Sequence, residues 1–263
     1  MAPALVASIF GLLIGSFLNV CIWRLPRGES IAWPASHCPS CKTPIRPYDN
    51  IPVLAYAWLG GKCRSCKARI PIQYPVVELL GGAAGFLAFS NWSGAYAAAA
   101  AVIFWSLIVV TWIDWEHQII PDEISIGGIV AGLVFSFFFP VWVGGPDAAA
   151  GWRALLGSIA GLLTGGGILY LMAVIGEKVF KKEAMGGGDV KLLAAIGAFF
   201  GWKGALFGLF AGSLVGSFAG LAVKWTLKKE TIPFGPYLAL GTVLYLFWGE
   251  PVLSWYVTHV LQY

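Results

Sequence analysis

The sequence predicts an all-α polytopic membrane protein, and three features of its composition support that prediction. Of its 263 residues, 58% are hydrophobic and only 11% are charged, whereas a soluble domain carries about 25% charged residues. The chain also holds 34 glycines, a residue that lets transmembrane helices approach closely. Its 13 tryptophans suit the boundary between lipid and water. Too few polar groups remain to cover a water-facing globule.

Apolar stretches then predict about eight transmembrane helices, since a bilayer core needs about 20 apolar residues per crossing. They lie at residues 3–23, 72–90, 95–113, 123–143, 153–175, 189–200, 203–223 and 235–260. The stretch 189–200 is short for a full crossing, so a re-entrant or tilted segment stays open around Gly201. The first stretch has no basic residue before it and no small-residue cleavage site after it, so we expect a retained helix and no signal peptide.

Basic residues set the expected orientation. If the segment after the first helix is cytoplasmic, 15 of the 17 Lys and Arg residues face the cytoplasm, all except Arg153 and Lys203. The opposite orientation would violate the positive-inside rule. We therefore expect both termini to face away from the cytoplasm. The net charge of +4 follows from this loop bias and indicates no nucleic-acid partner.

Three regions are expected along the chain: a first transmembrane helix at 1–23, a cytoplasmic loop domain at 24–71, and a membrane-embedded domain at 72–263. The loop domain carries eight basic side chains against Glu29 and Asp49. It is too short to build a large hydrophobic core, so we expect disulfide bonds or a bound metal ion to stabilise it.

Four cysteines in this domain can provide that stabilisation. Cys38 and Cys41 form one C-x-x-C pair, and Cys63 and Cys66 form a second pair, with 21 residues between the two pairs. Two such pairs fill a tetrahedral Zn²⁺ shell, and the reducing cytoplasm argues against the alternative of two disulfides. Four thiolates leave no open coordination position, so the zinc is expected to be structural. Cys21 is expected to be a buried apolar residue within the first helix.

Two aspartates are the candidate catalytic residues. Asp114 ends the third predicted helix, and Asp189 opens the sixth after Gly186, Gly187 and Gly188. The predicted topology places both at the cytoplasmic face, where charged residues are costly and usually functional. Two neighbouring carboxylates share one proton, so one can activate water while the other polarises a carbonyl. The three glycines leave room for an extended peptide backbone to approach.

Several of these carboxylates also have a purely structural interpretation. An aspartate at a helix start is often only an N-cap, which accounts for Asp189 taken alone and is the preferred interpretation of Asp122. Glu78 has no obvious partner, and both a functional role and contact with solvent stay open for it. Lys191 and His117 either tune the aspartate pair or, for Lys191, anchor the helix at the membrane surface.

The ordered set of motifs resembles bacterial prepilin peptidases, the type 4 leader peptidases of pilus and type II secretion systems. The resemblance covers nearly the whole chain and rests on Gly15–Val20 with Arg24-Leu25-Pro26, the two C-x-x-C pairs, Tyr74-Pro75 with Glu78, Asp114 with Pro121-Asp122, Gly186–Leu192, and Pro233-Phe234-Gly235-Pro236. Within the G-x-G-D pattern, Gly187 fills the open position.

The resemblance implies what the chain acts on and with which residues. Asp114 and Asp189 would be the catalytic pair of a G-x-G-D aspartyl protease, supported by the loop Gly186–Gly188 and by Lys191. The partners would be prepilin or pseudopilin precursors in the lipid bilayer, cut behind a short basic leader. Many family members then methylate the new N-terminus with S-adenosylmethionine, so this cofactor is implied by resemblance alone. The sequence carries no signal that sets the oligomeric state.

Three other hypotheses stay in view. A transporter would use carboxylates for proton coupling, but it predicts carboxylates near the bilayer midplane and an internal repeat. A scaffold would use the cysteine loop only to bind a partner. A peptidase without methyltransferase activity would cut the leader and leave the new amine unmodified.

Overall fold

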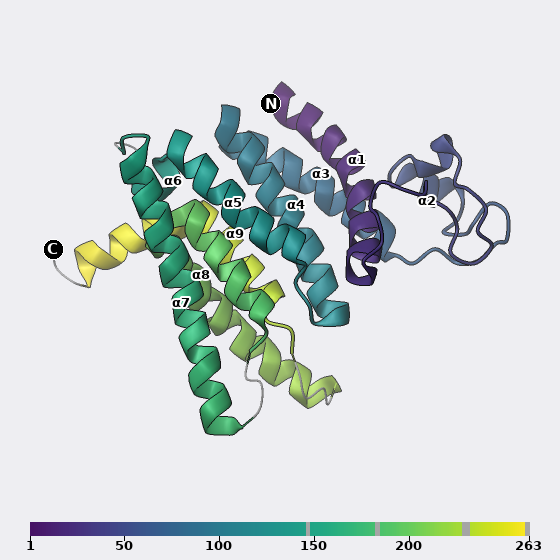
Figure 1. Ribbon diagram of the computed structural model, residues 1–263. Helices are drawn as coiled ribbons and strands as arrows, with labels where there is room; N and C mark the ends of the chain where they lie inside the picture. Colours follow the sequence, from purple (N-terminus) through teal and green to yellow (C-terminus); the bar gives the residue numbers. More distant parts are fainter. Residues whose placement is uncertain (146–147, 182–184, 228–231, 261–263) are drawn as a thin grey trace. The chain divides into compact units, whose positions relative to one another are not determined.

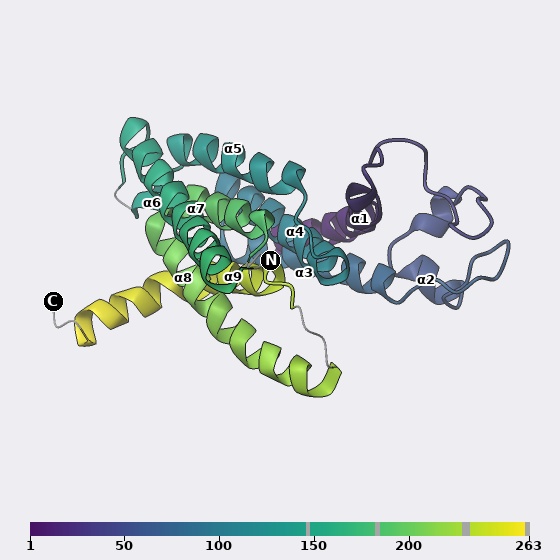
Figure 2. The ribbon, with the colours of Figure 1, turned by 60° about the horizontal axis from the view of Figure 1, so that its bottom comes forward.

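The computed structural model describes residues 1–145, 148–181, 185–227 and 232–260. Its elements are α1 (Ala2–Arg24), η1 (Leu25–Arg27), η2 (Pro47–Asn50), α2 (Leu54–Trp58), α3 (Gln73–Asn91), α4 (Gly94–His117), α5 (Asp122–Phe138), α6 (Val141–Gly144), α7 (Trp152–Phe180), α8 (Gly187–Leu227) and α9 (Gly235–His259). Figures 1 and 2 show helices and loops, and the only β-pairing in these residues consists of two isolated bridges. The all-α prediction is confirmed.

Most predicted helix boundaries lie within a few residues of those observed, but the predicted helix over 123–143 is wrong at its end. There α5 stops at Phe138 and a separate short helix, α6, begins at Val141. Phe139 leaves the helical region (φ −131°, ψ 77°), because a residue that precedes a proline, here Pro140, is disfavoured in the α conformation.

The break predicted at Gly201 is confirmed, and it turns α8 back on itself. Gly201 has φ 68° and ψ −172°, a conformation that favours glycine. A Cβ built on Gly165 of α7 would lie 2.5 Å from the carbonyl oxygen of Leu193 and 3.2 Å from the Cβ of Ala205, one from each half of α8. The two halves therefore run back along each other, with α7 against both.

Hydroxyl groups support the helix just before this turn. The carbonyl oxygen of Ala198, three residues before Gly201, accepts hydrogen bonds from Ser136 of α5 at 2.9 Å and Ser158 of α7 at 2.5 Å. Both serines are fully buried. Since a break in a helix leaves carbonyls without their usual donors, these hydroxyls satisfy a group that would otherwise be costly to bury.

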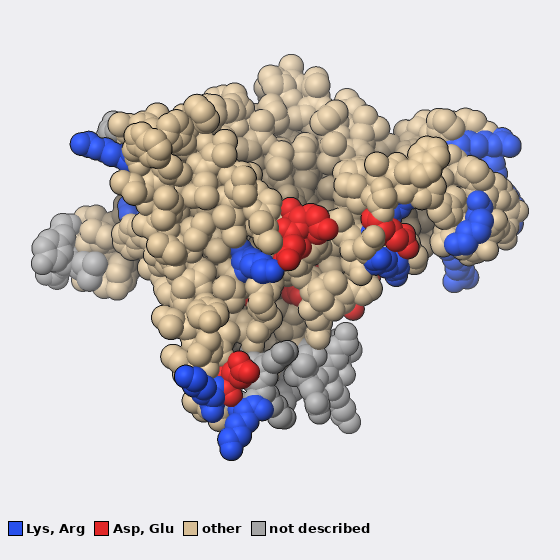
Figure 3. All heavy atoms as spheres, in the orientation of Figure 1, with Lys and Arg blue, Asp and Glu red and all other residues tan. Residues whose placement is uncertain are grey.

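Four helices in the described ranges are long and apolar enough to cross a membrane. They cover Ala2–Arg27, Gly94–His117, Trp152–Val179 and Gly187–Ala222, the last being the α8 element that folds back. Large apolar side chains such as Phe210 and Phe218 are exposed on these helices. On the face shown in Figure 3, charged side chains gather in a few places and the rest of the described surface is uncharged. The number of eight crossings stays a prediction, and Lys182, Lys228 and Lys229, used in orienting them, lie outside the described residues.

The chain divides into two compact units, Met1–Trp112 and Ile113–Tyr263. In the first unit α1 packs on α3 through small residues. A side chain on Gly11 would collide with the backbone of Gly81, and one on Gly15 would lie 2.6 Å from the Cα of Glu78. Such contacts let helix backbones approach closely. This is usual in a lipid bilayer, where the hydrophobic effect does not drive helices together and close packing has to hold them.

The cysteine loop of the first unit contains two hairpins of the same design. In the first, the amide of Cys38 donates to the carbonyl of Thr43 at 3.0 Å; in the second, the amide of Cys63 donates to that of Ala68 at 2.8 Å. The lysine after the second cysteine of each pair has a positive φ, 57° at Lys42 and 61° at Lys67. Each C-x-x-C pair therefore sits in a tight turn that directs two sulfurs to one side.

Candidate functional site

Asp114 lies in the last turn of α4, and only 5% of its surface is exposed. Its Oδ2 atom accepts a hydrogen bond from the backbone N–H of Gly235 at 2.8 Å. Gly235 is the first residue of α9, where backbone N–H groups lack partners within the helix and favour negative charge. The amide therefore stabilises the ionised form of the Asp114 carboxylate.

Asp189 lies in the first turn of α8 and is half-buried. Its Oδ1 atom has no accessible surface and no hydrogen-bond partner among the described residues. The carboxyl groups of Asp114 and Asp189 interact electrostatically, although 75 residues separate them in the sequence. Both aspartates belong to the second unit, and their pairing as a catalytic dyad stays a prediction. A buried carboxyl oxygen without a partner is available to a water molecule or a substrate group.

Ile120 links the segments that carry the aspartates, and sequence reasoning missed it. It is 8% exposed and lies in the short connection between α4 and α5. A Cβ on Gly188 would lie 2.9 Å from the Cβ of Ile120, and a Cβ on Gly235 would lie 3.3 Å from its Cδ1. Glycine at both positions lets the starts of α8 and α9 close on Ile120. The sequence around Ile120 gives only a weak signal for this packing role, namely two isoleucines directly before Pro121.

Asp122 does not cap α5, so the preferred sequence interpretation of this residue is wrong. The N-cap position is Pro121, with no side-chain cap, and Asp122 is the first helical residue. Its Oδ1 atom instead pairs with Nζ of Lys191 at 2.6 Å. Because Lys191 follows Asp189 by two residues, this ion pair ties the start of α8 to the start of α5.

His117 and Glu116 lie at the exposed end of α4 and contact each other. Their side chains are 34% and 47% exposed, and Nε2 of His117 lies 4.0 Å from Oε2 of Glu116. This is a weak surface contact. Glu116 is thus exposed to solvent.

Glu78 has a partner that the sequence does not reveal. It is 8% exposed, and its Oε2 atom accepts a hydrogen bond from the backbone N–H of Val53 at 2.7 Å. Val53 has a positive φ of 62° and precedes α2. Glu78 therefore fixes the segment between the two cysteine hairpins to α3, and the alternative in which it extends to solvent is wrong.

The four cysteines meet at one point of the first unit. Their Sγ atoms all lie within 4.8 Å of one another, and the Cys38 and Cys66 sulfurs are 3.8 Å apart. Four sulfurs placed tetrahedrally about 2.3 Å from a Zn²⁺ ion would be about 3.8 Å apart. The residues thus fit a four-thiolate metal site, and Cys21 lies elsewhere, buried in α1.

Thr43 adjusts the charge state of one of these thiols. Hydrogen bonding with its side chain, 3.3 Å from the sulfur, and with its backbone lowers the pKa of Cys41 to about 6. The thiolate, which is the metal-binding form, is thereby favoured at neutral pH. His37 beside Cys38 is no ligand of this cluster; its Nδ1 atom lies 3.1 Å from the Ala35 carbonyl.

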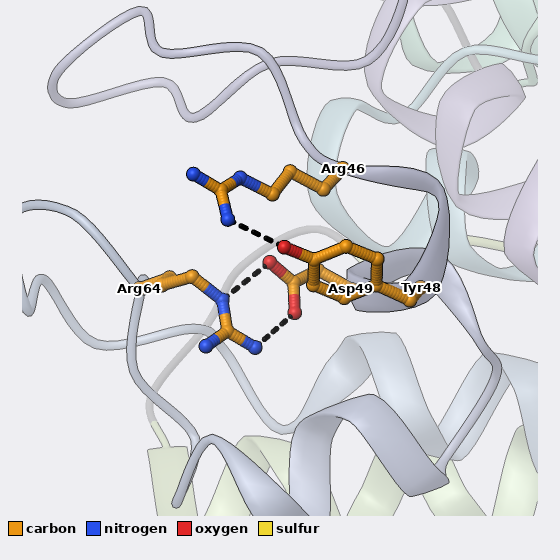
Figure 4. A network of polar contacts seen from close by, with 4 residues as sticks. All are labelled: Arg46, Tyr48, Asp49 and Arg64. Atoms are coloured by element: carbon orange, nitrogen blue, oxygen red, sulfur yellow. Dashed lines mark hydrogen bonds and ion pairs between the residues drawn. The ribbon is translucent and has the colours of Figure 1, made fainter.

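A polar network braces the second cysteine hairpin (Figure 4). Arg64 donates two hydrogen bonds to Asp49, at 2.7 and 2.6 Å, and Arg46 donates to the Tyr48 hydroxyl. The Asp49 side chain is only 7% exposed. The Arg64 hydrogen bonds hold the pKa of Asp49 below its usual range. The pair therefore contributes stability above the unfolded-state pKa of about 3.9, which is lost as the pH falls through the lower folded-state value.

Comparisons with known proteins agree with these two centres. Residues 9–92 match the bacterial peptidase A24 N-terminal domain, and residues 101–221 match the type IV leader peptidase family. The first match contains the cysteine cluster, and the second contains both aspartates.

Relatives match along almost the whole chain. A prepilin leader peptidase/N-methyltransferase of Aeromonas hydrophila is 35% identical, over 96% of this chain and 93% of its own. One of the same description from Pseudomonas aeruginosa is 34% identical, over 98% and 94%. A type 4 prepilin-like proteins leader peptide-processing enzyme of Escherichia coli O78:H11 is 37% identical, over 92% and 93%. No solved structure matches the chain.

Proposed function

This chain belongs to the type IV leader peptidase family, and on that premise we propose that Asp114 and Asp189 are its catalytic pair. It acts as an enzyme that removes the leader peptide from prepilin-like precursors and methylates the new N-terminus. The observation that carries the assignment is that Ile120 packs against Gly188, next to Asp189, and against Gly235, whose amide donates to Asp114. Two carboxyl groups brought together in this way can hold one proton between them and perform acid and base steps together.

The hydrogen bonds around the pair favour a division of roles. Asp114 accepts the Gly235 amide, which stabilises its negative charge, so Asp114 holds the charge before the substrate binds. Asp189, with a buried oxygen that has no partner among the described residues, then carries the proton. Asp114 removes a proton from water as the water attacks, and Asp189 donates its proton to the scissile carbonyl oxygen. The tetrahedral centre collapses when Asp114 gives the proton it took from water to the leaving amine, and Asp189 takes back its proton as the carbonyl re-forms.

Gly186 and Gly187 are exposed beside Asp189, and a Cβ on Gly187 would meet nothing within 4 Å. This open strip lets the extended backbone of a precursor pass close to the carboxyl groups. Gly188, in contrast, faces Ile120 and holds the loop against the protein. The glycine loop is therefore both a substrate path and a packing contact.

The membrane context supports the kind of substrate. A precursor with a basic leader and an apolar helix orients its leader toward the cytoplasm. We place both aspartates and the cysteine loop at that face of the bacterial inner membrane, with both termini on the other side. The cleavage site of the precursor then lies at the depth of the catalytic pair.

Zn²⁺ is the metal proposed for the four-cysteine site, with a structural role. The spacing of the sulfurs fits its tetrahedral geometry. The four thiolates of Cys38, Cys41, Cys63 and Cys66 would fill all four coordination positions of the ion. The ion would thus join the two hairpins of the 24–71 domain, and no coordination position would remain for water.

S-adenosylmethionine, when bound, supplies a methyl group activated by a sulfonium charge.

The test is to incubate the purified full-length chain with a prepilin-like precursor and S-adenosylmethionine and to determine the product masses. We expect a free leader and a mature N-terminus one methylene heavier than the unmodified peptide. A cut but unmethylated product would indicate a peptidase without the second activity. An uncut precursor would reject the proposed function and would favour a transporter or a scaffold.

A further inference from the structure

We propose that a pocket beside the aspartate pair receives the apolar side chain that follows the cut in the precursor, and so selects which precursors are cleaved. The pocket lies between α7, the second half of α8 and the start of α9, all in the second unit. The proposal rests on the function proposed above, which requires a precursor but assigns no residue to the choice of its sequence.

The rim of the pocket adjoins both of the segments that carry the site. Phe234 lines it and directly precedes Gly235, whose amide donates to Asp114 at 2.8 Å. Met185 also lines it and directly precedes the glycine loop, whose first carbonyl accepts the amide of Asp189 at 3.2 Å. A substrate backbone that runs along the glycines therefore reaches the pocket as soon as it passes the aspartates.

The lining of the pocket is apolar except for hydroxyl groups, and no charged side chain of the described residues borders it. One of these hydroxyls, that of Ser217, already donates to the carbonyl of Ser213 at 2.7 Å. A charged group placed there would lose its water without gaining a partner, which is costly. The pocket therefore suits the apolar part of a precursor and not its basic leader.

The walls of the pocket belong to membrane-spanning helices. Helix α7 contributes Leu169 and Met172, and α8 contributes Leu209; both helices are long and apolar enough to cross a membrane. The two aspartates, in contrast, lie at helix ends. A precursor whose apolar helix enters the bilayer from the cleavage site therefore carries its first apolar side chains past these walls.

The size of the pocket suits one large side chain better than a whole small molecule. Its volume is about 290 Å³, just below the range of about 300–1,000 Å³ that is usual for ligand pockets. Met172 and Met185, the two methionines of the chain besides Met1, both line it. Methionine is flexible and polarisable and is common on surfaces that accept several partners. The pocket should therefore accept large apolar side chains of different shapes.

One wall of the pocket, between α8 and α9, is rigid. Tyr237 is 9% exposed. A Cβ on Gly216 would lie 3.2 Å from its ring, and a Cβ on Gly212 would lie 2.7 Å from its carbonyl oxygen. Such glycine contacts hold two helices closely together. This wall is therefore fixed, and the methionines supply the adaptable part of the lining.

The experiment offers the purified full-length protein two precursors in one reaction. They differ only in the residue after the cut, leucine in one and alanine in the other, and the ratio of the two products gives the ratio of kcat/KM. Because both precursors meet the same enzyme, this ratio does not depend on how much of a variant is folded. The wild type should prefer leucine at least about tenfold, as an apolar pocket that the side chain fills does.

Two variants change the pocket in opposite directions. Ser213→Phe fills it and should bring the ratio of leucine to alanine close to one. Leu209→Ala enlarges it and, when tryptophan competes with leucine, should shift the ratio toward tryptophan at least about fivefold relative to the wild type. Leu214→Phe and Leu206→Ala are the matched controls, because both leucines are exposed on α8 outside the pocket. Both controls should keep the wild-type ratios.

Wild-type ratios in both pocket variants, or equal changes in the controls, would overturn the proposal and would leave the pocket to a lipid acyl chain. If Ser213→Phe cuts neither precursor, Leu209→Ala alone decides. A wild-type protein that cuts neither precursor would reject the peptidase function and this role of the pocket with it. Unchanged ratios with both precursors cut would reject the pocket alone.

Discussion

The carboxylate of Asp114 accepts the backbone amide of Gly235 at 2.8 Å, across 121 residues of sequence. The contact joins the end of α4 to the first residue of α9. It orients one oxygen of the proposed catalytic pair and stabilises its charge. The start of α9 is therefore part of the site, although neither Gly235 nor Pro236 carries a reactive side chain.

Replacing Gly235 with alanine should lower activity without unfolding the protein. The new Cβ would lie 2.8 Å from Oδ2 and 3.2 Å from Cγ of Asp114. Rotation of the carboxyl group relieves this contact most easily, which displaces the catalytic oxygen. We expect leader cleavage to fall about tenfold to a hundredfold, as a small misplacement of a reacting group does. Gly127→Ala, where a Cβ meets nothing within 4 Å, is the control; equal rates for the two variants would contradict this role of Gly235.

The glycines before Asp189 should differ in their tolerance of alanine. A Cβ on Gly187 enters open space, whereas one on Gly188 would lie 2.9 Å from Cβ and 3.3 Å from the backbone nitrogen of Ile120. Neither atom can rotate away, so the loop itself must shift. Gly187→Ala narrows the substrate path but meets no protein atom, so it should slow cleavage less than Gly188→Ala, which should cleave at least about tenfold more slowly than the wild type. Cleavage of a precursor by the two purified variants tests this, and the reverse order would show that packing on Ile120 is unimportant.

The ion pair between Lys191 and Asp122 should position the start of α8. Both side chains are about half exposed, so the pair contributes at most about 1 kcal/mol. Lys191→Met should therefore slow cleavage by up to about fivefold and leave the melting temperature nearly unchanged. The exchange Lys191→Asp with Asp122→Lys should recover part of the rate, and the exposed Lys178→Met serves as control. An exchange variant no better than either single charge reversal would exclude the pair as a positioning contact.

The sequence predicted the local elements of the structure but not these contacts between distant residues. Periodicity and composition predicted the helices, and the C-x-x-C spacing predicted the cysteine cluster. The break at Gly201 also followed from the short apolar stretch before it. Local sequence patterns determine the conformation of the segment that contains them. The helices, the cysteine turns and the break at Gly201 are all local features, so these predictions were correct.

Partners far along the chain could not be predicted in this way. Asp122 pairs with Lys191 across 69 residues, and Glu78 bonds to Val53 across 25. Asp122 was interpreted as a cap because that is the common local role of an aspartate at such a position. Only the packing of separate helices decides whether a charge finds a distant partner instead.

Metal analysis should separate the four clustered cysteines from the fifth. The full-length protein should contain one equivalent of zinc, and Cys63→Ser should lose most of it because a tetrahedral site needs all four ligands. Cys21→Ser should retain the metal, since Cys21 is buried in α1 away from the cluster. Elemental analysis of the purified proteins gives the result. Zinc near one equivalent in Cys63→Ser would reject the four-cysteine site.

The most direct test of the account is leader cleavage by the single variants Asp114→Asn and Asp189→Asn. Asparagine keeps the size of each side chain and removes its ability to exchange a proton. Each variant should retain zinc as the wild type does, because the cysteine cluster belongs to the other unit. Each should lose cleavage by at least about a hundredfold, as the removal of a general acid or base does. Cleavage at the wild-type rate by either variant would contradict the proposed aspartate pair.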